Sequence, residues 1–453
     1  MNTRRRFTLV TPFTLLGFTL LLFVAEPMLA DDRHLYVDAN ASYNGDGSRH
    51  HPYWRITDAV VRARALRQED RENDSKTPED RNDNKGKIVI HVLPGTYAGS
   101  YDPDRLAANP RLELLPIILN VSNLNLAGGT ELDEDARGLP TGTYPPDSET
   151  LLTTADVTTG LLRGQMLLLI ATTTDGMAGN EVSVSGFVMD AQAQDLAGVR
   201  GLNIYADRVS DFAIHRNLLR HATVGAQTRL ASGTFEANFV GPNNAATEGT
   251  GIHITGGSVI HPARVTVRRN RSTQNSHGAA LHALANFLEL KLGSNTLKLE
   301  PLQMSFDINN PKDQQNVPGR LEVAIEGNDF SNNSFVGLRC GFYPPFFYTT
   351  ADATQPVTGT LDVIVRDNEL NRNFDYGITV DPANARRSNS RRLTGRFEGT
   401  FEHNSLIDNG RNASVFGFTS LNASTGRAPR QDFKYVQGAT FQVEDLDWGF
   451  RRR

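Results

Sequence analysis

Cysteine is almost missing from this chain of 453 residues. The single Cys340 excludes an intrachain disulfide and a cysteine-based zinc cluster. An excess of basic residues is missing too, because 46 Lys and Arg stand against 51 Asp and Glu, a net charge of −5. That balance excludes a strongly basic nucleic-acid binder, and we expect no nucleic-acid partner. Also absent are a phosphate-binding glycine loop, an HExxH zinc motif and a nucleophile elbow.

The first 30 residues are typical of an export signal. A basic run at 4–6 precedes an apolar run at 13–25, and Met28-Leu29-Ala30 is a usable cleavage site. The basic run also resembles a twin-arginine signal, so a secretory and a twin-arginine route both stay open. An uncleaved membrane anchor is the alternative, although the apolar run is short for a span. No later segment is apolar enough to cross a membrane. We therefore expect a secreted or periplasmic protein without membrane contact after cleavage.

The remaining chain repeats itself, with the clearest copies at 264–282, 321–341 and 361–381. Asparagines recur at two positions five residues apart. The first position holds Asn217, Asn238, Asn270, Asn328, Asn368 and Asn404, and the second holds Ala222, Asn243, Asn275, Asn333, Asn373 and Asn409. Alternating apolar residues precede the first position, which indicates a strand that ends there, and a glycine after the second position opens a further strand.

Three short strands per repeat indicate one coil of a parallel β-solenoid. A single coil cannot bury its apolar face, so stacking must supply the core, with neighbouring coils about 4.8 Å apart. Asparagine tolerates the left-handed backbone of a sharp corner, and its amide can both donate and accept along a stack. The alternative, that asparagine only marks loops, does not explain why the two positions keep one register.

These repeats resemble the right-handed parallel β-helix of the pectin-lyase-like superfamily, with its asparagine ladder. The segments 35–48, 52–66 and 87–97 are similar to the strand, short helix and "strand-PGTY" coil that begin this fold. The resemblance covers about residues 34–443. It implies an all-β chain, a single-stranded right-handed parallel β-helix of three sheets with a short N-terminal capping helix. It does not fix the activity, since the same fold carries lyases, hydrolases, epimerases and adhesins.

The domain organisation follows from where the repeat holds and where it breaks. We expect an export signal at 1–30, a cap and first coils at 31–130, an insertion at 131–180, repeats at 181–443 with insertions at 283–320, 342–359 and 382–395, and a tail at 444–453.

Alternation along the third strand of each coil separates inward from outward residues. Cys340 falls in the inward set and is expected to be inert. His282 and Asp381 fall in one outward column two coils apart, roughly 9–10 Å, with Gly341 leaving a gap between them. Arg339 stands in the neighbouring column. We predict these three residues, His282, Arg339 and Asp381, as catalytic.

Each predicted residue has a chemical role. Arg339 can pair with a uronate carboxylate, and His282 can act as general base or acid. Asp381 can orient a hydroxyl, hold a cation such as Ca²⁺ or carry the second proton. Plain solvation of an outer sheet face is the alternative for each of them. Predicted substrate contacts are Tyr205, Arg229, His253, Tyr343, Phe346, Phe347 and Tyr348.

The predicted function is action on, or binding of, a polysaccharide or cell-surface glycan. A lyase acting on an acidic glycan fits the outward residues best, and a glycoside hydrolase is the other enzyme class. The triple-Asp signature of the family's galacturonan hydrolases and the Asp cluster of its calcium-dependent pectate lyases are both absent. Non-catalytic carbohydrate binding, surface attachment and a purely structural role therefore stay open, as does whether the protein is an enzyme.

Overall fold

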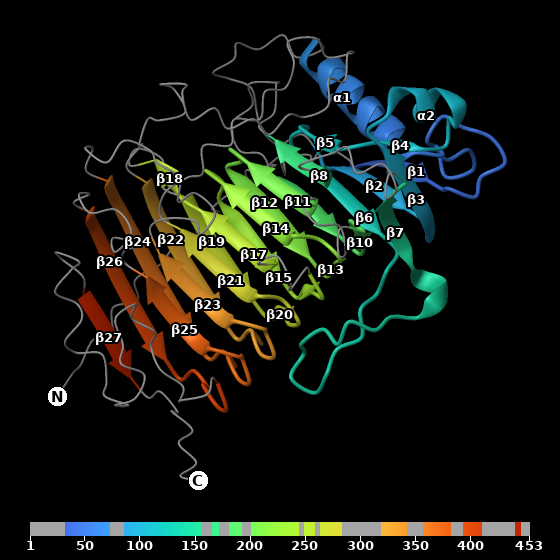
Figure 1. The fold of residues 1–453 in the computed structure, drawn as a ribbon. Coiled ribbons are helices and arrows are strands. Elements are labelled where there is room, and N and C mark those ends of the chain that lie inside the picture. Colours follow the sequence, from blue (N-terminus) through green and yellow to red (C-terminus); the bar gives the residue numbers. More distant parts are fainter. Residues whose placement is uncertain are drawn as a thin grey trace, which may run out of the picture.

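The computed structural model describes the greater part of the chain between residues 32 and 444. The described ranges are 32–72, 86–155, 165–171, 181–192, 201–243, 249–258, 263–282, 319–341, 357–381, 393–409 and 440–444. Its strands stack side by side along one axis, from the N-terminal coils to the C-terminal ones (Figure 1). Three long sheets result, which we call sheets A, B and C in the order in which the chain visits them.

Sheet A runs along the whole stack. In spatial order it contains β1 (Arg33–Val37), β2 (Ile88–Val92), β6 (Leu124–Gly128), β9 (Glu181–Ser185), β12 (Asp211–His215), β15 (Gly233–Glu236), β19 (Ala263–Arg268), β22 (Gly319–Glu326), β24 (Val357–Arg366), β26 (Leu393–Glu402) and β27 (Thr440–Glu444). All of these neighbours pair in parallel, and β18 (Gly257–Ser258) adds an antiparallel pair to β22.

Sheets B and C complete each coil. Sheet B contains β4 (Glu113–Leu114), β3 (Gly95–Ser100), β7 (Thr150–Thr154), β10 (Val188–Asp190), β13 (Leu218–Arg220), β16 (Phe239–Val240) and β20 (Arg271–Ser272). Sheet C contains β5 (Ile117–Leu119), β8 (Gln165–Ala171), β11 (Gly201–Asp207), β14 (Val224–Arg229), β17 (Thr250–Thr255), β21 (His277–His282), β23 (Val336–Gly341) and β25 (Tyr376–Asp381). The predicted fold class is confirmed: the chain is a right-handed parallel β-helix of three sheets.

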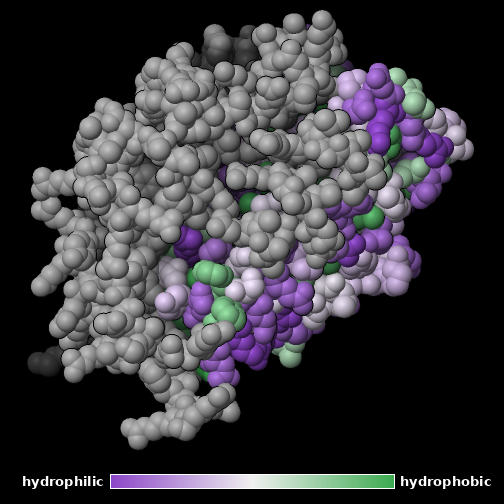
Figure 2. All heavy atoms as spheres, viewed as in Figure 1, coloured by the Kyte–Doolittle hydropathy of each residue, from purple (hydrophilic) through white to green (hydrophobic). Residues whose placement is uncertain are grey.

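The core fills the inside of the coils. Inward residues of successive coils pack against one another, as Phe212 and Phe235 do with ring centroids 5.2 Å apart in an edge-on arrangement. Burying one such side chain contributes roughly 1.5–3 kcal/mol. Cys340 is fully buried among these residues, and burial raises the pKa of its thiol. The surface of the described residues in Figure 2 is mostly hydrophilic, with only scattered hydrophobic side chains.

Hydrogen bonds join the asparagines from coil to coil. The side-chain oxygen of Asn270 accepts from the backbone N–H of Asn238 at 3.0 Å and from its amide group at 2.9 Å. Asn328 accepts from Asn270 in the same way. The second column repeats the pattern, for example where Asn333 accepts from the backbone N–H of Asn275 at 3.1 Å. All of these side chains are buried, so each amide satisfies donors that water cannot reach.

The left-handed corner lies one residue before each asparagine. Positive φ angles occur at Arg216, Ala237, Arg269, Gly327, Asp367 and His403 before the first column, and at His221, Gln274, Asn332, Arg372 and Asp408 before the second. The expectation that asparagine serves the corner by tolerating the left-handed backbone is therefore wrong. Asparagine stands in the columns for its amide, which the hydrogen bonds use on both its oxygen and its nitrogen.

The predicted N-terminal helix is α1 (Ile56–Glu72), which packs against β1, β2, β4 and β5 at the first coils (Figure 1). Its first turn is held by Glu113 of β4, whose carboxylate accepts from the backbone N–H groups of Ile56 and Thr57 and from the Thr57 hydroxyl. Complete burial raises the pKa of Glu113 to about 7, although these hydrogen bonds oppose the rise. A second helix, α2 (Pro103–Ala108), is capped by Asp102, and a 3-10 turn, η1, covers Pro146–Ser148.

The range 131–180, predicted as an insertion, contains two strands of the solenoid, β7 and β8. The part that leaves the coil is the loop between β6 and β7. Of the predicted insertions, 283–318, 342–356 and 382–392 lie outside the described residues, and β22, β24 and β26 begin at their C-terminal ends. The predicted export signal also lies outside the described residues. None of the described helices is long and apolar enough to cross a membrane.

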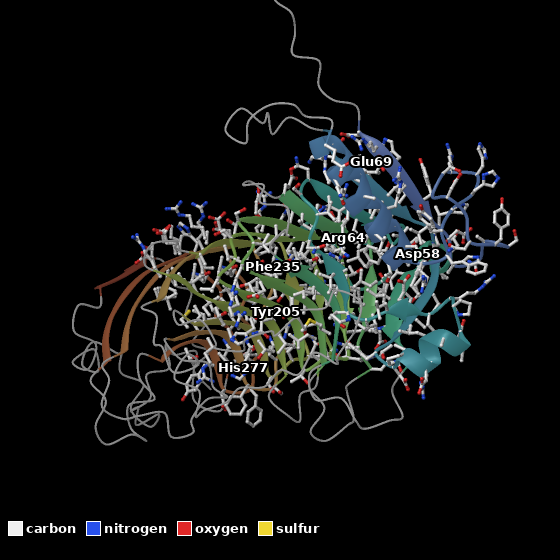
Figure 3. All side chains as sticks on the ribbon, turned by 90° about the horizontal axis from the view of Figure 1, so that it is seen from above. Asp58, Arg64, Glu69, Tyr205, Phe235 and His277 are labelled. Atoms are coloured by element: carbon white, nitrogen blue, oxygen red, sulfur yellow. The ribbon has the colours of Figure 1, made fainter. Side chains whose placement is uncertain are left out.

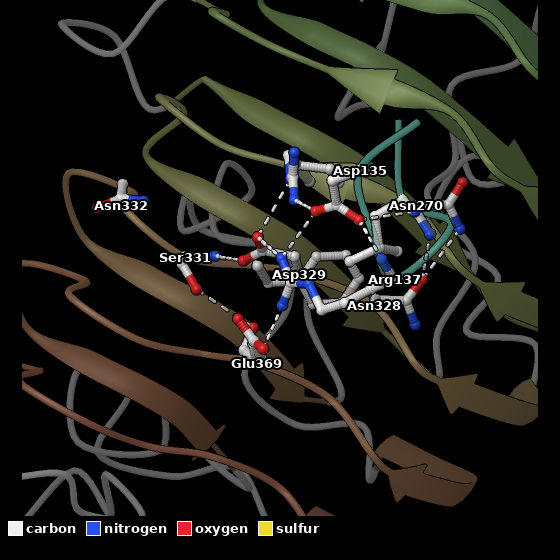
Figure 4. A network of polar contacts seen from close by, with 12 residues as sticks. Asp135, Arg137, Asn270, Asn328, Asp329, Ser331, Asn332 and Glu369 are labelled. Atoms are coloured by element: carbon white, nitrogen blue, oxygen red, sulfur yellow. Dashed lines mark hydrogen bonds and ion pairs between the residues drawn. The ribbon is translucent and has the colours of Figure 1, made fainter. Parts of the chain in front are cut away.

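The β6–β7 loop is tied to coils that follow much later in the sequence (Figure 4). Arg137 lies 3.1 Å from the Asp135 carboxylate and 3.5 Å from that of Asp329, and it also pairs with Glu369. Arg271 bonds Asp329 at 3.1 Å and reaches Asp135. Burial would raise the pKa of Asp135, but hydrogen bonds from the Arg137 backbone and the Arg271 side chain outweigh it and lower the pKa. The loop is thus fastened across several coils of sheet B.

Candidate functional site

The outward face of sheet C carries two columns of residues. Strand register places Tyr205, Gln227, His253, Ala280, Arg339 and Thr379 in the first column, and Asp207, Arg229, Thr255, His282, Gly341 and Asp381 in the second. His282, Gly341 and Asp381 therefore occupy successive coils of one column, beside Arg339. The side chains of His282 and Asp381 lie outside the described residues, as do Tyr343, Phe346, Phe347 and Tyr348, so the roles of these six residues stay predictions.

The register of β11 is offset by two residues from the position of its opening glycine. Tyr205 pairs with Gln227, and Asp207 pairs with Arg229, whereas counting from the glycines Gly201 and Gly225 would align Tyr205 with Arg229. Gly201 opens its strand two residues earlier than the glycines of later coils do. Asn203 on the same strand is completely buried and donates through Nδ2 to the Arg220 carbonyl at 3.0 Å.

The shift in register hid an ion pair. Nε of Arg229 lies 2.6 Å from one Asp207 oxygen, and Nη2 lies 2.9 Å from the other. Both residues are almost completely buried, at 3% and 9% exposure. Two parallel bonds between a guanidinium and a carboxylate make a geometrically specific pair. Arg229 is therefore bound to a neighbouring coil, and its contact with substrate stays a prediction.

The part of this face from β11 to β17 is buried, whereas Arg339 and Thr379 on β23 and β25 are half-buried. Tyr205 and His253 are each only 2% exposed, although both point away from the core. Alternation in a sequence reports which side of a strand a residue faces, but not whether that side is covered. At the N-terminal end the covered face is apolar, with a second hydrophobic cluster of Met166, Leu169, Leu202, Tyr205 and Val224. Burial there raises the pKa of Tyr205, whose hydroxyl has no hydrogen-bond partner.

Polar chemistry on this face concentrates around two histidines. Burial, and after it the charge of Arg339, lower the pKa of His253 to about 4. Burial, Arg339 and His253 together lower the pKa of His277 to about 3. Both imidazoles are therefore neutral at pH 7. Ala280 lies between His253 and Arg339 in their column, so only a methyl group separates the two long side chains.

His277 begins β21 and is buried beside this face. Its ring lies 5.9 Å from that of Phe335, and its Nδ1 is buried without a hydrogen-bond partner. Figure 3 shows His277 and Tyr205 below Phe235 of the core, on the side of sheet C. A buried polar atom without a partner is costly, about 1–3 kcal/mol, so both atoms are candidates for contact with a ligand. No group of three or more His, Cys, Asp or Glu residues that could hold a metal occurs in the described part of the chain, so the Ca²⁺ role of Asp381 stays a prediction.

Comparisons with known proteins give similarity only at the level of the fold. No family model matches the chain, and no curated protein sequence matches it. Among solved structures, the A-module of the mannuronan C-5 epimerase AlgE4 from Azotobacter vinelandii is 12% identical, with 92% of this chain and 98% of that chain covered and a TM-score of 0.38.

Two other solved structures are similar to a comparable degree. The pectate lyase Pel9A is 11% identical, with 93% and 79% covered and a TM-score of 0.32. ORF18 of Geobacillus virus E2 is 12% identical with a TM-score of 0.30; 81% of this chain is covered, but the match spans only 55% of that chain. At such identities the chemistry of the site has to be argued from its own residues.

Proposed function

We propose that the protein is an exported β-helix that binds an acidic polysaccharide at the outer face of sheet C and cleaves it by elimination. The observation that carries the proposal is the placement of Arg339 on the same face as two buried histidines, His253 and His277, whose pKa values are lowered by burial and then by its charge. A half-buried cation and neutral imidazoles within reach of its field are the parts that such a reaction needs.

The roles divide as follows. Arg339 pairs with the uronate carboxylate and offsets the charge that builds up when the neighbouring ring carbon loses its proton. A neutral histidine, His253 among the described residues or the predicted His282, accepts that proton. The glycosidic oxygen leaves with a proton as the carbon–carbon double bond forms. Asp381 is proposed to orient a sugar hydroxyl or to carry this second proton, and the aromatic residues 343 and 346–348 to stack on sugar rings.

Binding without catalysis is the second candidate. The buried Asp207–Arg229 pair and the apolar cluster around Tyr205 favour it, because they leave fewer polar groups for substrate at the N-terminal half of the face. A protein of this kind would hold a glycan chain at a surface without changing it. Cleavage and non-catalytic binding would use the same face of sheet C. Only cleavage would transfer a proton from the sugar ring to the protein.

A lyase is detected by the absorbance of the unsaturated sugar that elimination leaves. Purified protein is incubated with a panel of uronic-acid polymers, and the absorbance of the unsaturated product is followed with time. Arg339→Ala and His253→Gln are expected to abolish the signal while circular dichroism shows an intact fold. Matched controls on sheet A are Arg366→Ala, which breaks an exposed pair with Glu326, and His215→Gln, which removes a bond to Ser183. Both controls should keep wild-type activity.

Three outcomes decide between the candidates. No absorbance change with any polymer, together with retention on a glycan array that Arg339→Ala abolishes, would replace cleavage by binding. Unchanged activity in Arg339→Ala and His282→Ala would remove the proposed site. Loss of activity in the two sheet A controls would mean that the variants report folding instead of chemistry.

A further inference from the structure

Two imidazole rings meet on the outer face of sheet A, far along the stack from the Arg339 site. His34 of β1 and His91 of β2 lie with their ring centroids 5.2 Å apart and their planes at 25°. Nδ1 of His34 and Nε2 of His91 are 2.9 Å apart. Neighbouring residues in both strands point into the core, so both rings face outward, and His34 is exposed.

The two nitrogens are close enough to become ligands of one metal ion. Their separation of 2.9 Å is the length of a hydrogen bond between the rings. With a metal–nitrogen distance of about 2.0–2.1 Å, two ligands on one ion are about 2.9–3.3 Å apart, so a rotation of either ring is enough to turn both lone pairs toward an ion. Among divalent ions, nitrogen ligands bind Cu²⁺ more tightly than Ni²⁺ or Zn²⁺.

Metal binding requires no change in the net charge of the pair. In the present contact one nitrogen carries a hydrogen and the other accepts it. If the donor ring moves that hydrogen to its other nitrogen, both facing nitrogens offer a lone pair and both rings stay neutral.

Tyr36 holds one of the two ligands in place. Its ring stacks on that of His91 with centroids 4.8 Å apart and planes at 18°, and the two residues are register partners on adjacent strands. A ring fixed in this way loses less freedom when it binds a metal. Both strands are regular, so the positions of the ligands are set by rigid elements.

We propose that His34 and His91 together bind a divalent transition metal, Cu²⁺ or Ni²⁺ in preference to Zn²⁺, with water in the remaining positions. Bound metal joins β1 to β2 and so fastens the first coil to the second. Because the ion binds only the folded arrangement, it stabilises the protein against unfolding.

The test is titration calorimetry of the untagged protein with Cu²⁺, Ni²⁺ and Zn²⁺ in a buffer that does not coordinate metals. We expect affinity in the order Cu²⁺, Ni²⁺, Zn²⁺, and a loss of at least about tenfold in Cu²⁺ affinity for either His34→Ala or His91→Ala. His51→Ala, at another exposed histidine, and His215→Gln, on the same face of sheet A, should bind as the wild type does. Electron paramagnetic resonance of the Cu²⁺ complex should show nitrogen coupling that both ligand variants reduce.

Several results would overturn the proposal. Cu²⁺ affinity that His34→Ala and His91→Ala leave unchanged would assign the binding to other histidines. An equal loss in His51→Ala would do the same, and Zn²⁺ binding tightest would contradict the expected preference for Cu²⁺. Thermal unfolding without metal shows whether the variants fold, and metal should raise the melting temperature of the wild type more than that of either ligand variant.

Discussion

The carboxylate of Asp207 and the guanidinium of Arg229 form two hydrogen bonds across neighbouring coils, at 2.6 and 2.9 Å, with both groups buried. Burying either charge without the other would be far more costly than burying the pair. The pair lies at the end of β11 and β14 and fixes the register of the two strands. A hydrophobic contact at this position would be less specific about register.

Breaking this pair should strongly destabilise the protein. Arg229→Met leaves the Asp207 carboxylate buried alone, and we expect a loss of about 3–5 kcal/mol in the free energy of unfolding. The double variant Asp207→Leu/Arg229→Met should recover most of that loss. Urea denaturation followed by circular dichroism measures both. Arg366→Ala, in an exposed pair, should cost no more than about 1 kcal/mol. Equal losses in the single and double variants would show that the charge is not the cause.

The asparagine columns should be intolerant of substitution. Asn270→Ala removes the oxygen that accepts from Asn238 and the amide that donates to the Phe235 carbonyl at 3.0 Å. At least one buried donor is then left unsatisfied, at about 1–3 kcal/mol each, so unfolding in urea should occur at clearly lower concentration. Asn332→Gly is the control, because Asn332 is exposed and its positive φ suits glycine. A control as damaging as Asn270→Ala would refute the reasoning.

At the left-handed corner before the first asparagine column, two substitutions should change stability in opposite directions. Gly327 has φ 61° and open space around the position of a Cβ atom, so Gly327→Ala should destabilise through the backbone alone, by about 1–2 kcal/mol. Asp367 occupies the same corner one coil later with φ 58°, and Asp367→Gly should stabilise by a comparable but smaller amount. Differential scanning calorimetry checks both signs. Shifts in the same direction would contradict the assignment of the strain to φ.

Stability should depend on pH through Glu113. Its folded pKa of about 7 lies above the ordinary 4.5, so the folded state holds the proton more tightly than the unfolded state does. The resulting stabilisation is complete below about pH 4.5 and is lost as pH rises through about 7. Glu113→Gln, which can still accept from the N-terminus of α1, should remove this part of the slope. His253 and His277 act in the opposite sense, because their lowered pKa values cost stability as pH falls below 6.5.

The contribution of Glu113 is therefore measured as the difference in stability between the wild type and Glu113→Gln. Urea midpoints of wild type and Glu113→Gln are compared from about pH 4.5 to about pH 8, which cancels the contribution of the histidines in both proteins. The variant should gain on the wild type as pH rises. A constant difference over this range would mean that Glu113 titrates normally in the folded protein.

The fold could be predicted from the sequence because each coil repeats both its spacing and its asparagine side chains. Asn270, Asn328 and Asn368 have to coincide for their amides to bond, so their spacing reports the coils directly. The site was less readable. Gly201 resembles the glycines of later coils and yet begins its strand two residues early, which concealed Asp207 as the partner of Arg229. The burial of His253 and His277 depends on what covers sheet C, and no local pattern encodes it.

The hydrogen bonds of the columns all run in one sense: each asparagine oxygen receives donors from the coil before it, and Asn409 ends the second column with a buried amide nitrogen that has no acceptor. The stack thus has a polarity, and in the first column the same bond, from an asparagine N–H to the next asparagine oxygen, recurs from Asn238 to Asn404. A whole turn of the helix, such as 321–360, could be duplicated or excised without creating a new kind of joint, so the natural unit by which this protein lengthens or shortens is the complete turn.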